Sequence, residues 1–145
     1  MTARVLSFCA LVVLATSAFA DTSAPTPVKG MKVVVLPSGL EYVDIRKGTG
    51  AEAKAYKKVV VHYTGWLADE PHKKFDSSVD RHEPFEFVLG SGQVIRGWDE
   101  GLEGMKVGGR RQLHIPAKLA YGDRGAGAIP PGSDLVFDCA LIDVK

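Results

Sequence analysis

The sequence predicts a single α+β domain in which an antiparallel sheet packs against one short helix. Several short segments alternate apolar and polar residues, which is typical of strands with one buried face; they are MKVVVL, LEYVDIRKG, KKVVVHYTGWL, PFEFVLG, RRQLHI and DLVFDCALIDV. Residues 93–108 differ, because Ile95, Trp98 and Leu102 recur there at the spacing of one helical face. A sheet and a helix that each have one apolar face can bury these faces against each other, which favours a two-layer domain.

Residues 1–20 have the pattern of a secretory signal peptide and are left out of the fold. Arg4 precedes an uncharged apolar run, and Ala18-Phe19-Ala20 forms a small-x-small cleavage site before Asp21. The alternative is a membrane anchor, but the apolar run falls short of the roughly 20 residues that a spanning helix needs. We therefore expect cleavage after Ala20, no membrane attachment afterwards, and export to a bacterial periplasm or secretion. The last residues, LIDVK, form no endoplasmic-reticulum retention signal, so the lumen of that compartment is less expected.

The remaining chain divides into a predicted flexible tether and one domain. Residues 21–30 are small, polar and proline-containing, which predicts a tether. The domain, residues 31–145, is long enough for one hydrophobic core and too short for two. It begins with two strands on either side of Pro37-Ser38-Gly39, a turn signal.

The later strands each place their large apolar residues on one face. The strand around residues 57–67 separates one apolar set from a second set on the face that we expect to be solvated; the first set is Val59, Val61, Tyr63 and Leu67, and the second is Val60, His62, Thr64 and Trp66. The other strands group Phe85 with Phe87 and Leu89, Arg111 with Leu113 and Ile115, and Leu135 with Phe137, Cys139 and Leu141.

The predicted helix contains more glycine than an isolated helix tolerates. Each interior glycine costs about 1 kcal/mol relative to alanine, so this segment would not stay helical alone. Gly97 and Gly101 lie four residues apart, on one side of the helix, where missing side chains permit a close approach to the sheet. We predict that the sheet holds this helix in place.

Composition argues against several classes of function. The chain has 18 basic residues (Lys and Arg) and 17 acidic residues (Asp and Glu). One basic residue, Arg4, lies in the signal segment, so the remaining chain is formally neutral. It contains no basic block, so we expect no nucleic acid partner. Loss of Cys9 with the signal would leave Cys139 alone, which excludes an intramolecular disulfide. The histidines have no metal-ligand spacing, so we predict neither a metal site nor a cofactor; they are His62, His72, His82 and His114.

Aromatic residues at the ends of predicted elements are the conspicuous candidates for a binding site. Phe75 precedes Asp76, Phe85 follows a proline, and Tyr121 precedes a glycine. Such positions often line a cleft, although core packing is the simpler explanation for any one ring. Asp76 has Arg81 five residues further on as a possible charge partner, which could be a loop-stabilising ion pair or part of a site.

The order of several motifs makes the resemblance to a known family specific. The segments VHYTGWL, KFDSS, EPFEFVLG, QVIRGWDEGLEGMKVG, AYG and IPPGSDLVFD follow one another as in the FKBP-type peptidyl-prolyl cis–trans isomerases. The resemblance covers about residues 36–144. It implies an antiparallel sheet of about five strands wrapped around one short helix, with an apolar pocket between them and the tryptophan of the helix as its floor.

The resemblance also implies the site residues and the activity. The residues expected to act in catalysis are Tyr63, Phe75, Asp76, Trp98 and Tyr121; those expected to bind substrate are Phe85, Val94, Ile95, Ile129 and Phe137. The Ile95 N–H and the Tyr121 hydroxyl would bond carbonyls of a bound peptide or of a macrolide inhibitor, and Asp76 would be oriented by Tyr63 and Arg81. The expected activity is rotation of X–Pro bonds in exported proteins during folding. The expected partners are proline-containing polypeptides and macrolide inhibitors.

The sequence departs from the family pattern in two loops, and one alternative function is also consistent with it. The loops at 67–74 and 122–129 differ in length from the usual family pattern, and both border the predicted pocket. The alternative function is a non-catalytic module or chaperone that holds proline-containing segments in the same pocket. We expect a monomer, since no long helical segment precedes the first predicted strand.

Overall fold

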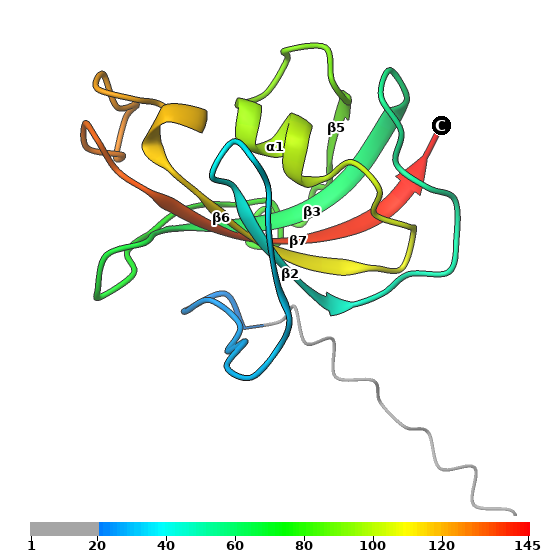
Figure 1. Ribbon diagram of the computed structural model, residues 1–145, viewed down its shortest axis with the longest axis horizontal. Coiled ribbons are helices and arrows are strands. Elements are labelled where there is room, and N and C mark those ends of the chain that lie inside the picture. Colours follow the sequence, from blue (N-terminus) through cyan, green and yellow to red (C-terminus); the bar gives the residue numbers. More distant parts are fainter. Residues whose placement is uncertain (1–20) are drawn as a thin grey trace, which may run out of the picture.

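The computed structural model describes residues 21–145, and the predicted signal peptide lies outside the described residues. The described chain forms one antiparallel sheet with a short helix on one of its faces (Figure 1). In chain order the elements are β1 (Val33–Val35), β2 (Glu41–Arg46), β3 (Lys58–Leu67), β4 (Lys74–Ser77), β5 (Phe85–Val88), α1 (Arg96–Gly101), β6 (Arg110–Ile115), the 3₁₀ turn η1 (Ala117–Leu119) and β7 (Leu135–Val144). The predicted α+β class is confirmed.

Seven strands make up the sheet in residues 21–145, where the resemblance implied about five. Their order is β1-β2-β6-β7-β3-β4, and β5 also pairs with β3 beside the end of β4. The strand β4 was not predicted, because its four residues, KFDS, are too few and too polar to show the alternation of a strand. It is a strand because it pairs with β3, in the register Thr64↔Ser77 and Gly65↔Asp76.

The core lies between the inner face of the sheet and α1, and the predicted inward faces of β3, β6 and β7 are confirmed. The buried residues that these strands contribute to the core are Val59, Val61, Tyr63, Leu113, Ile115, Leu135, Phe137, Cys139 and Leu141. Of the other two residues predicted on these faces, Leu67 is half-buried and packs against this cluster, and Arg111 is buried. Alternation along each strand therefore decided which side chains reach the core.

The glycines of α1 allow it to lie unusually close to β6. A Cβ atom added at Gly97 would lie 2.4 Å from Cγ2 of Ile115, and one added at Gly101 would lie 2.9 Å from Cδ2 of Leu113. Both distances are shorter than a carbon–carbon contact allows, since the optimum is roughly 3.5–4.0 Å. The two glycines are therefore required by packing, as predicted, and their cost to helix propensity is offset by burial of Trp98, which is 4% exposed.

The helix is shorter than the stretch that was predicted to contain it. It spans six residues, and Leu102 caps it through a backbone hydrogen bond to the Trp98 carbonyl. The chain then turns at Gly104 and Gly108, both of which have positive φ angles (87° and 91°) that side chains rarely adopt. Met105 lies between these turns and packs into the core.

The segment predicted to be a flexible tether lies across the outer face of the sheet, opposite α1 (Figure 1, blue). The Thr26 N–H donates to Oδ2 of Asp138 (2.9 Å), and Nε2 of Gln112 donates to the Thr26 carbonyl (2.8 Å). Nε1 of Trp66 donates to the Thr22 carbonyl (3.2 Å). We call residues 21–28 the strap. The expectation of a free tether is thereby corrected for the part of the segment that makes these bonds.

The strap lies over a row of buried polar side chains, one of which, Thr64, was predicted to face solvent. Nε2 of Gln112 donates to Oδ1 of Asp138 (2.8 Å), and Thr64 and Ser77 share a hydrogen bond (2.9 Å). Cross-strand register places these four residues side by side on β6, β7, β3 and β4. The outer face thus buries these polar side chains together with the apolar Trp66 and Val136, and the four polar groups are satisfied by one another and by the strap.

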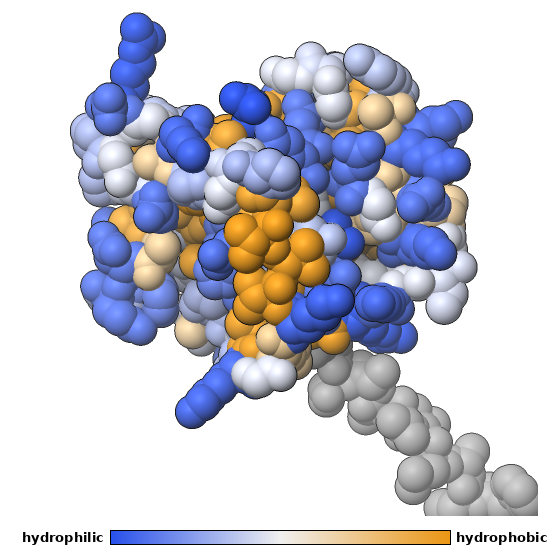
Figure 2. All heavy atoms as spheres, in the orientation of Figure 1, coloured by the Kyte–Doolittle hydropathy of each residue, from blue (hydrophilic) through white to orange (hydrophobic). Residues whose placement is uncertain are grey.

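The first strand leaves an apolar stripe at one edge of the sheet. Met31, Val33 and Val35 are 41%, 50% and 62% exposed. Figure 2 shows a continuous apolar band over the place that β1 occupies in Figure 1. Lys29 and Lys32 adjoin it, and charged side chains beside an edge strand oppose pairing with a second sheet.

No helix between residues 21 and 145 has the length and apolar character to cross a membrane.

Replacing Gly97 with alanine should lower the free energy of unfolding by about 1–3 kcal/mol, because the added methyl group overlaps Ile115. Urea unfolding followed by circular dichroism measures the effect. Arg96→Ala is the matched control, since Arg96 is an exposed residue of the same helix, and it should change stability by less than about 0.5 kcal/mol. Equal effects of both substitutions would show that α1 does not lie this close to the sheet.

Candidate active site

A hollow of about 200 Å³ opens where the N-terminal end of α1 meets the inner face of the sheet. It is lined by Tyr63, Phe75, Asp76, Phe85, Gln93, Val94, Ile95, Trp98, Tyr121 and Phe137. These residues come from β3, β4, β5, β7, α1 and two loops, so the fold gathers parts of the chain that are far apart in sequence.

Nine of the ten predicted site residues line this hollow, and the tenth does not. Ile129 is 7% exposed and packs in the core cluster. Its loop is closed on itself, because the Ile129 N–H donates to the Ala126 carbonyl and the Ala126 N–H donates back. Gln93 lines the hollow but was not predicted. Its position directly before Val94 and Ile95 was the available signal.

Trp98 lies at the centre of an aromatic cluster that forms the floor of the hollow. Its ring centroid is 4.8 Å from that of Tyr63 and 5.3 Å from that of Phe137, with near-perpendicular planes in both pairs. Phe85 packs edge-to-face on the same indole at 6.1 Å. Rings that lock one another in this geometry form a rigid apolar surface. The indole Nε1–H is buried and has no hydrogen-bond partner among the described residues.

A β-bulge and a glycine place Phe75 beside this floor. The register between β3 and β4 shifts between Gly65, which pairs with Asp76, and Trp66, which pairs with Lys74, so Phe75 is the extra residue. A Cβ atom at Gly65 would lie 2.6 Å from both the Phe75 and Phe137 rings. Phe75 therefore lies over Gly65 and meets Phe137 at 5.5 Å, edge to face.

Asp76 is held at the rim by two side chains and by the Ser77 N–H, which donates to Oδ1 (2.9 Å). The Tyr63 hydroxyl donates to Oδ2, and the Arg81 guanidinium forms an ion pair with Oδ1. Nη2 of Arg81 also donates to the Tyr63 hydroxyl (3.2 Å), which closes a three-residue network. The predicted pairing of Asp76 with Arg81 is therefore present, and it places a fixed negative charge beside an otherwise apolar hollow.

The two tyrosines of the hollow are protonated at neutral pH. Burial raises the pKa of Tyr63, and the hydrogen bond to Asp76 raises it further. Burial also raises the pKa of Tyr121, with a smaller contribution from the charge of Asp76. Both phenols therefore stay protonated near pH 7 and do not titrate there.

Two hydrogen-bond donors at the hollow have no partner within residues 21–145. The Ile95 N–H donates to nothing there, although the Ile95 carbonyl accepts from Trp98 and Asp99 at the start of α1. The Tyr121 hydroxyl is likewise without a partner, and Tyr121 is 39% exposed. Both donors are thus available to carbonyl groups of a bound molecule.

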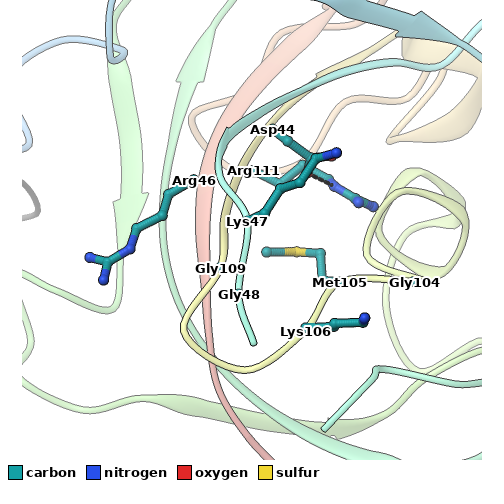
Figure 3. A pocket seen from close by; sticks show the side chains of 9 residues that line it. All are labelled: Asp44, Arg46, Lys47, Gly48, Gly104, Met105, Lys106, Gly109 and Arg111. Atoms are coloured by element: carbon teal, nitrogen blue, oxygen red, sulfur yellow. Dashed lines mark hydrogen bonds and ion pairs between the residues drawn. The ribbon is translucent and has the colours of Figure 1, made fainter. Parts of the chain in front are cut away.

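A second hollow, of about 240 Å³, has a different character (Figure 3). Lys47 and Lys106 flank it, while Arg46 points away from it. Arg111 in its wall is already paired with Asp44 at 2.8 Å and stacks on Tyr42 at 4.0 Å. Apart from Met105, its lining consists of charged residues and glycines, and it contains no aromatic ring.

Residues 21–145 contain no group of three His, Cys, Asp or Glu side chains arranged to hold a metal ion. Burial lowers the pKa of His62 and of His114, so both imidazoles are neutral at pH 7. Burial also raises the pKa of the Cys139 thiol well above its usual value, so the thiol is not a nucleophile.

Comparison with known proteins places this chain in a family. The family model described as FKBP-type peptidyl-prolyl cis-trans isomerase matches residues 50–142. An FK506-binding protein of Neisseria meningitidis serogroup A is 54% identical over 102 residues, which are 70% of this chain and 92% of the relative.

Solved structures agree with the sequence comparison. The crystal structure of AtFKBP13 superposes with a TM-score of 0.72 at 44% identity, over 79% of this chain and 99% of that one. The crystal structure of FkpA from Escherichia coli gives a TM-score of 0.71 at 47% identity, over 78% of this chain. The match spans 51%, about half, of the FkpA chain.

Trp98→Ala should lower both stability and ligand binding, because the indole belongs to the core and to the floor of the hollow. Loss of a buried aromatic ring costs about 3–5 kcal/mol of unfolding free energy. Leu102→Ala is the control, since Leu102 is buried at 1% exposure beside the same helix but does not line the hollow. Urea unfolding and titration with a proline-containing peptide should show lost stability in both variants and lost affinity, in the folded fraction, only in Trp98→Ala. Retained affinity in Trp98→Ala would place the ligand elsewhere.

Proposed function

This chain belongs to the family of FKBP-type peptidyl-prolyl cis–trans isomerases, and from that premise we propose that its aromatic hollow binds the prolyl ring of an X–Pro segment and favours the twisted amide. The family establishes isomerase activity. The single observation that carries the proposed mechanism is the rigid apolar floor around Trp98, with unpartnered donors at its rim.

Rotation of an X–Pro bond is slow because amide resonance must be broken. The barrier is about 18–20 kcal/mol, and uncatalysed exchange takes on the order of tens to hundreds of seconds. Twisting removes the resonance and makes the carbonyl group less polar. An apolar, water-poor site therefore stabilises the twisted amide relative to the planar one, which is differential binding of the transition state. A rate increase of about a thousandfold to a millionfold requires only about 4–8 kcal/mol.

Each lining group has a role that its surroundings support. Trp98 is the surface on which the prolyl ring lies, with Phe75, Phe85 and Phe137 as walls. Val94 at the mouth of the hollow extends the apolar wall. The Ile95 N–H and the Tyr121 hydroxyl donate to carbonyl groups of the bound chain and fix its direction across the hollow.

Asp76 acts through its charge. Its carboxylate is already bonded to Tyr63 and Arg81, so its position does not depend on the substrate. A fixed carboxylate near the amide disfavours the planar form, in which the carbonyl oxygen carries the most negative charge. This role needs no proton transfer and no covalent intermediate.

The same hollow would take a macrolide ligand. The relative from Neisseria meningitidis is named for binding FK506, and the apolar floor and rim donors described above are suited to a ring-shaped ligand with carbonyl groups. We further propose that the mature enzyme is an exported monomer that assists the folding of other exported chains. The lysines beside the exposed edge strand support the monomeric state.

The catalytic efficiency, kcat/KM, should be nearly constant from about pH 6 to pH 8. The raised pKa values of Tyr63 and Tyr121 keep both phenols protonated in this range, and no other group is required to gain or lose a proton in the reaction. A tetrapeptide with a central X–Pro bond, followed by a protease-coupled or NMR exchange assay, measures the rate. Tyr121→Phe should lower the rate by about two- to tenfold, the effect of one hydrogen bond, without a new pH dependence.

Circular dichroism at each pH controls for unfolding. The lowered pKa of His114 means that the unfolded chain binds a proton more readily than the folded one, so stability falls as the pH drops below about 6.5. A tenfold change in kcat/KM between pH 6 and pH 8, with the protein fully folded, would overturn the mechanism. A wild-type rate equal to the uncatalysed one would instead support a non-catalytic binding module.

A further inference from the structure

The loop between β4 and β5 reaches both faces of the sheet at its edge. In this loop Asp80 and Arg81 are neighbours in sequence, yet their side chains have partners on opposite sides of β4. Arg81 bonds Asp76 and Tyr63 at the hollow, whereas Asp80 bonds the strap and Lys74 on the outer side. These two sets of contacts hold the short loop across the edge strand β4. We call the loop and these contacts the clip.

The outer half of this clip is a closed network of three side chains. The Thr22 hydroxyl donates to Oδ1 of Asp80 (2.7 Å) and accepts from Nζ of Lys74 (2.9 Å). Lys74 also forms an ion pair with Oδ2 of Asp80. Thr22 is 8% exposed, and its carbonyl accepts from the buried indole of Trp66. The strap therefore presents the hydroxyl from a fixed position.

The contacts on the inner side of the clip depend on the position in which the loop holds the Arg81 side chain. The Arg81 side chain is 48% exposed, so packing does little to fix it. The base of the loop is anchored by Ser78, whose N–H donates to the Tyr63 carbonyl (3.0 Å). Beyond that base, the His82 and Glu83 N–H groups close the loop on the Val79 and Ser78 carbonyls (3.1 and 3.2 Å), and the Asp80 carboxylate ties it to the outer face. Loss of the Asp80 contacts would leave the Arg81 backbone more conformational freedom and make its bonds at the hollow less frequent.

We propose that Thr22 and Asp80 are positioning residues for the isomerase site, which act by fixing the loop that presents Arg81 to Asp76 and Tyr63. The inference rests on the proposed role of Asp76 in the hollow. It gives the strap a function beyond covering the sheet, because its second residue couples the outer face to the site. The strap begins one residue after Ala20, so it belongs to the chain that the expected cleavage would release.

Substitutions at two threonines of the strap separate positioning from a purely structural role. Thr22→Val keeps the shape and removes the hydroxyl, and it should lower kcat/KM on an X–Pro tetrapeptide about threefold, the scale of one hydrogen bond. Thr22→Ser keeps the hydroxyl and should restore the wild-type value. Thr26→Val removes the hydroxyl bond to Asp138 at the other end of the strap, so it should lower the urea midpoint without changing kcat/KM of the folded enzyme. Ser23→Ala, at an exposed neighbour, should change neither.

A double-mutant cycle with Arg81→Ala shows whether Thr22 acts through Arg81. In the Arg81→Ala background, Thr22→Val should have no further effect on kcat/KM, since coupled residues are not additive. Additive losses, or no loss in Thr22→Val itself, would overturn the inference while leaving the proposed function intact. If Arg81→Ala has wild-type activity, the proposed role of the Asp76 network is wrong, and the inference that rests on it is overturned as well. Equal losses in Thr22→Val and Thr26→Val would assign the strap a structural role only.

Discussion

The close contact between α1 and β6 is the constraint on which the rest of the site depends. Gly97 and Gly101 let the helix approach until its backbone touches Ile115 and Leu113, so the helix is short, poor in intrinsic propensity and held by the sheet. The distance between the helix and the sheet sets the position of the Trp98 indole. The indole in turn sets the packing of Tyr63 and Phe137. If an added methyl group pushed the helix away from the sheet, the Trp98 indole that forms the floor of the hollow would be displaced.

The same sheet carries different chemistry on its two faces. The inner face supplies aromatic rings, which in the proposed mechanism stabilise an amide that loses polarity as it twists. The outer face buries a polar row from Gln112 to Ser77 under the strap, and hydrogen bonds within this row link neighbouring strands. The edge strand β4 connects the faces, because a bulge at Phe75 turns consecutive residues inward and the following loop contacts both sides. Contacts of this loop thus link the rim of the hollow to the strap behind the sheet.

Sequence reasoning succeeded where local pattern and burial coincide. Alternation in β3, β6 and β7 predicted the inward faces, and the helical spacing of Trp98 predicted the orientation of α1. The site itself required the family resemblance, because Tyr63, Phe75 and Tyr121 are spread over a strand, a bulge and a loop, and no local pattern brings them together. The strap was missed for a physical reason. Its small polar residues are typical of a tether, and only the folded sheet provides the buried Asp138, Gln112 and Trp66 that bind it. Ile129 does not line the hollow, since its loop closes on itself and its side chain packs in the core.

The most direct test of the account is to locate a bound prolyl ring relative to Trp98. Intermolecular nuclear Overhauser effects between a proline-containing peptide and the protein report contacts within about 5 Å, the range over which ring faces pack. The account predicts cross-peaks from the prolyl ring protons to the indole of Trp98, together with upfield shifts of the prolyl signals from the ring current. Prolyl contacts confined to the exposed β1 edge or to the charged hollow beside Lys106, with none to Trp98, would contradict it.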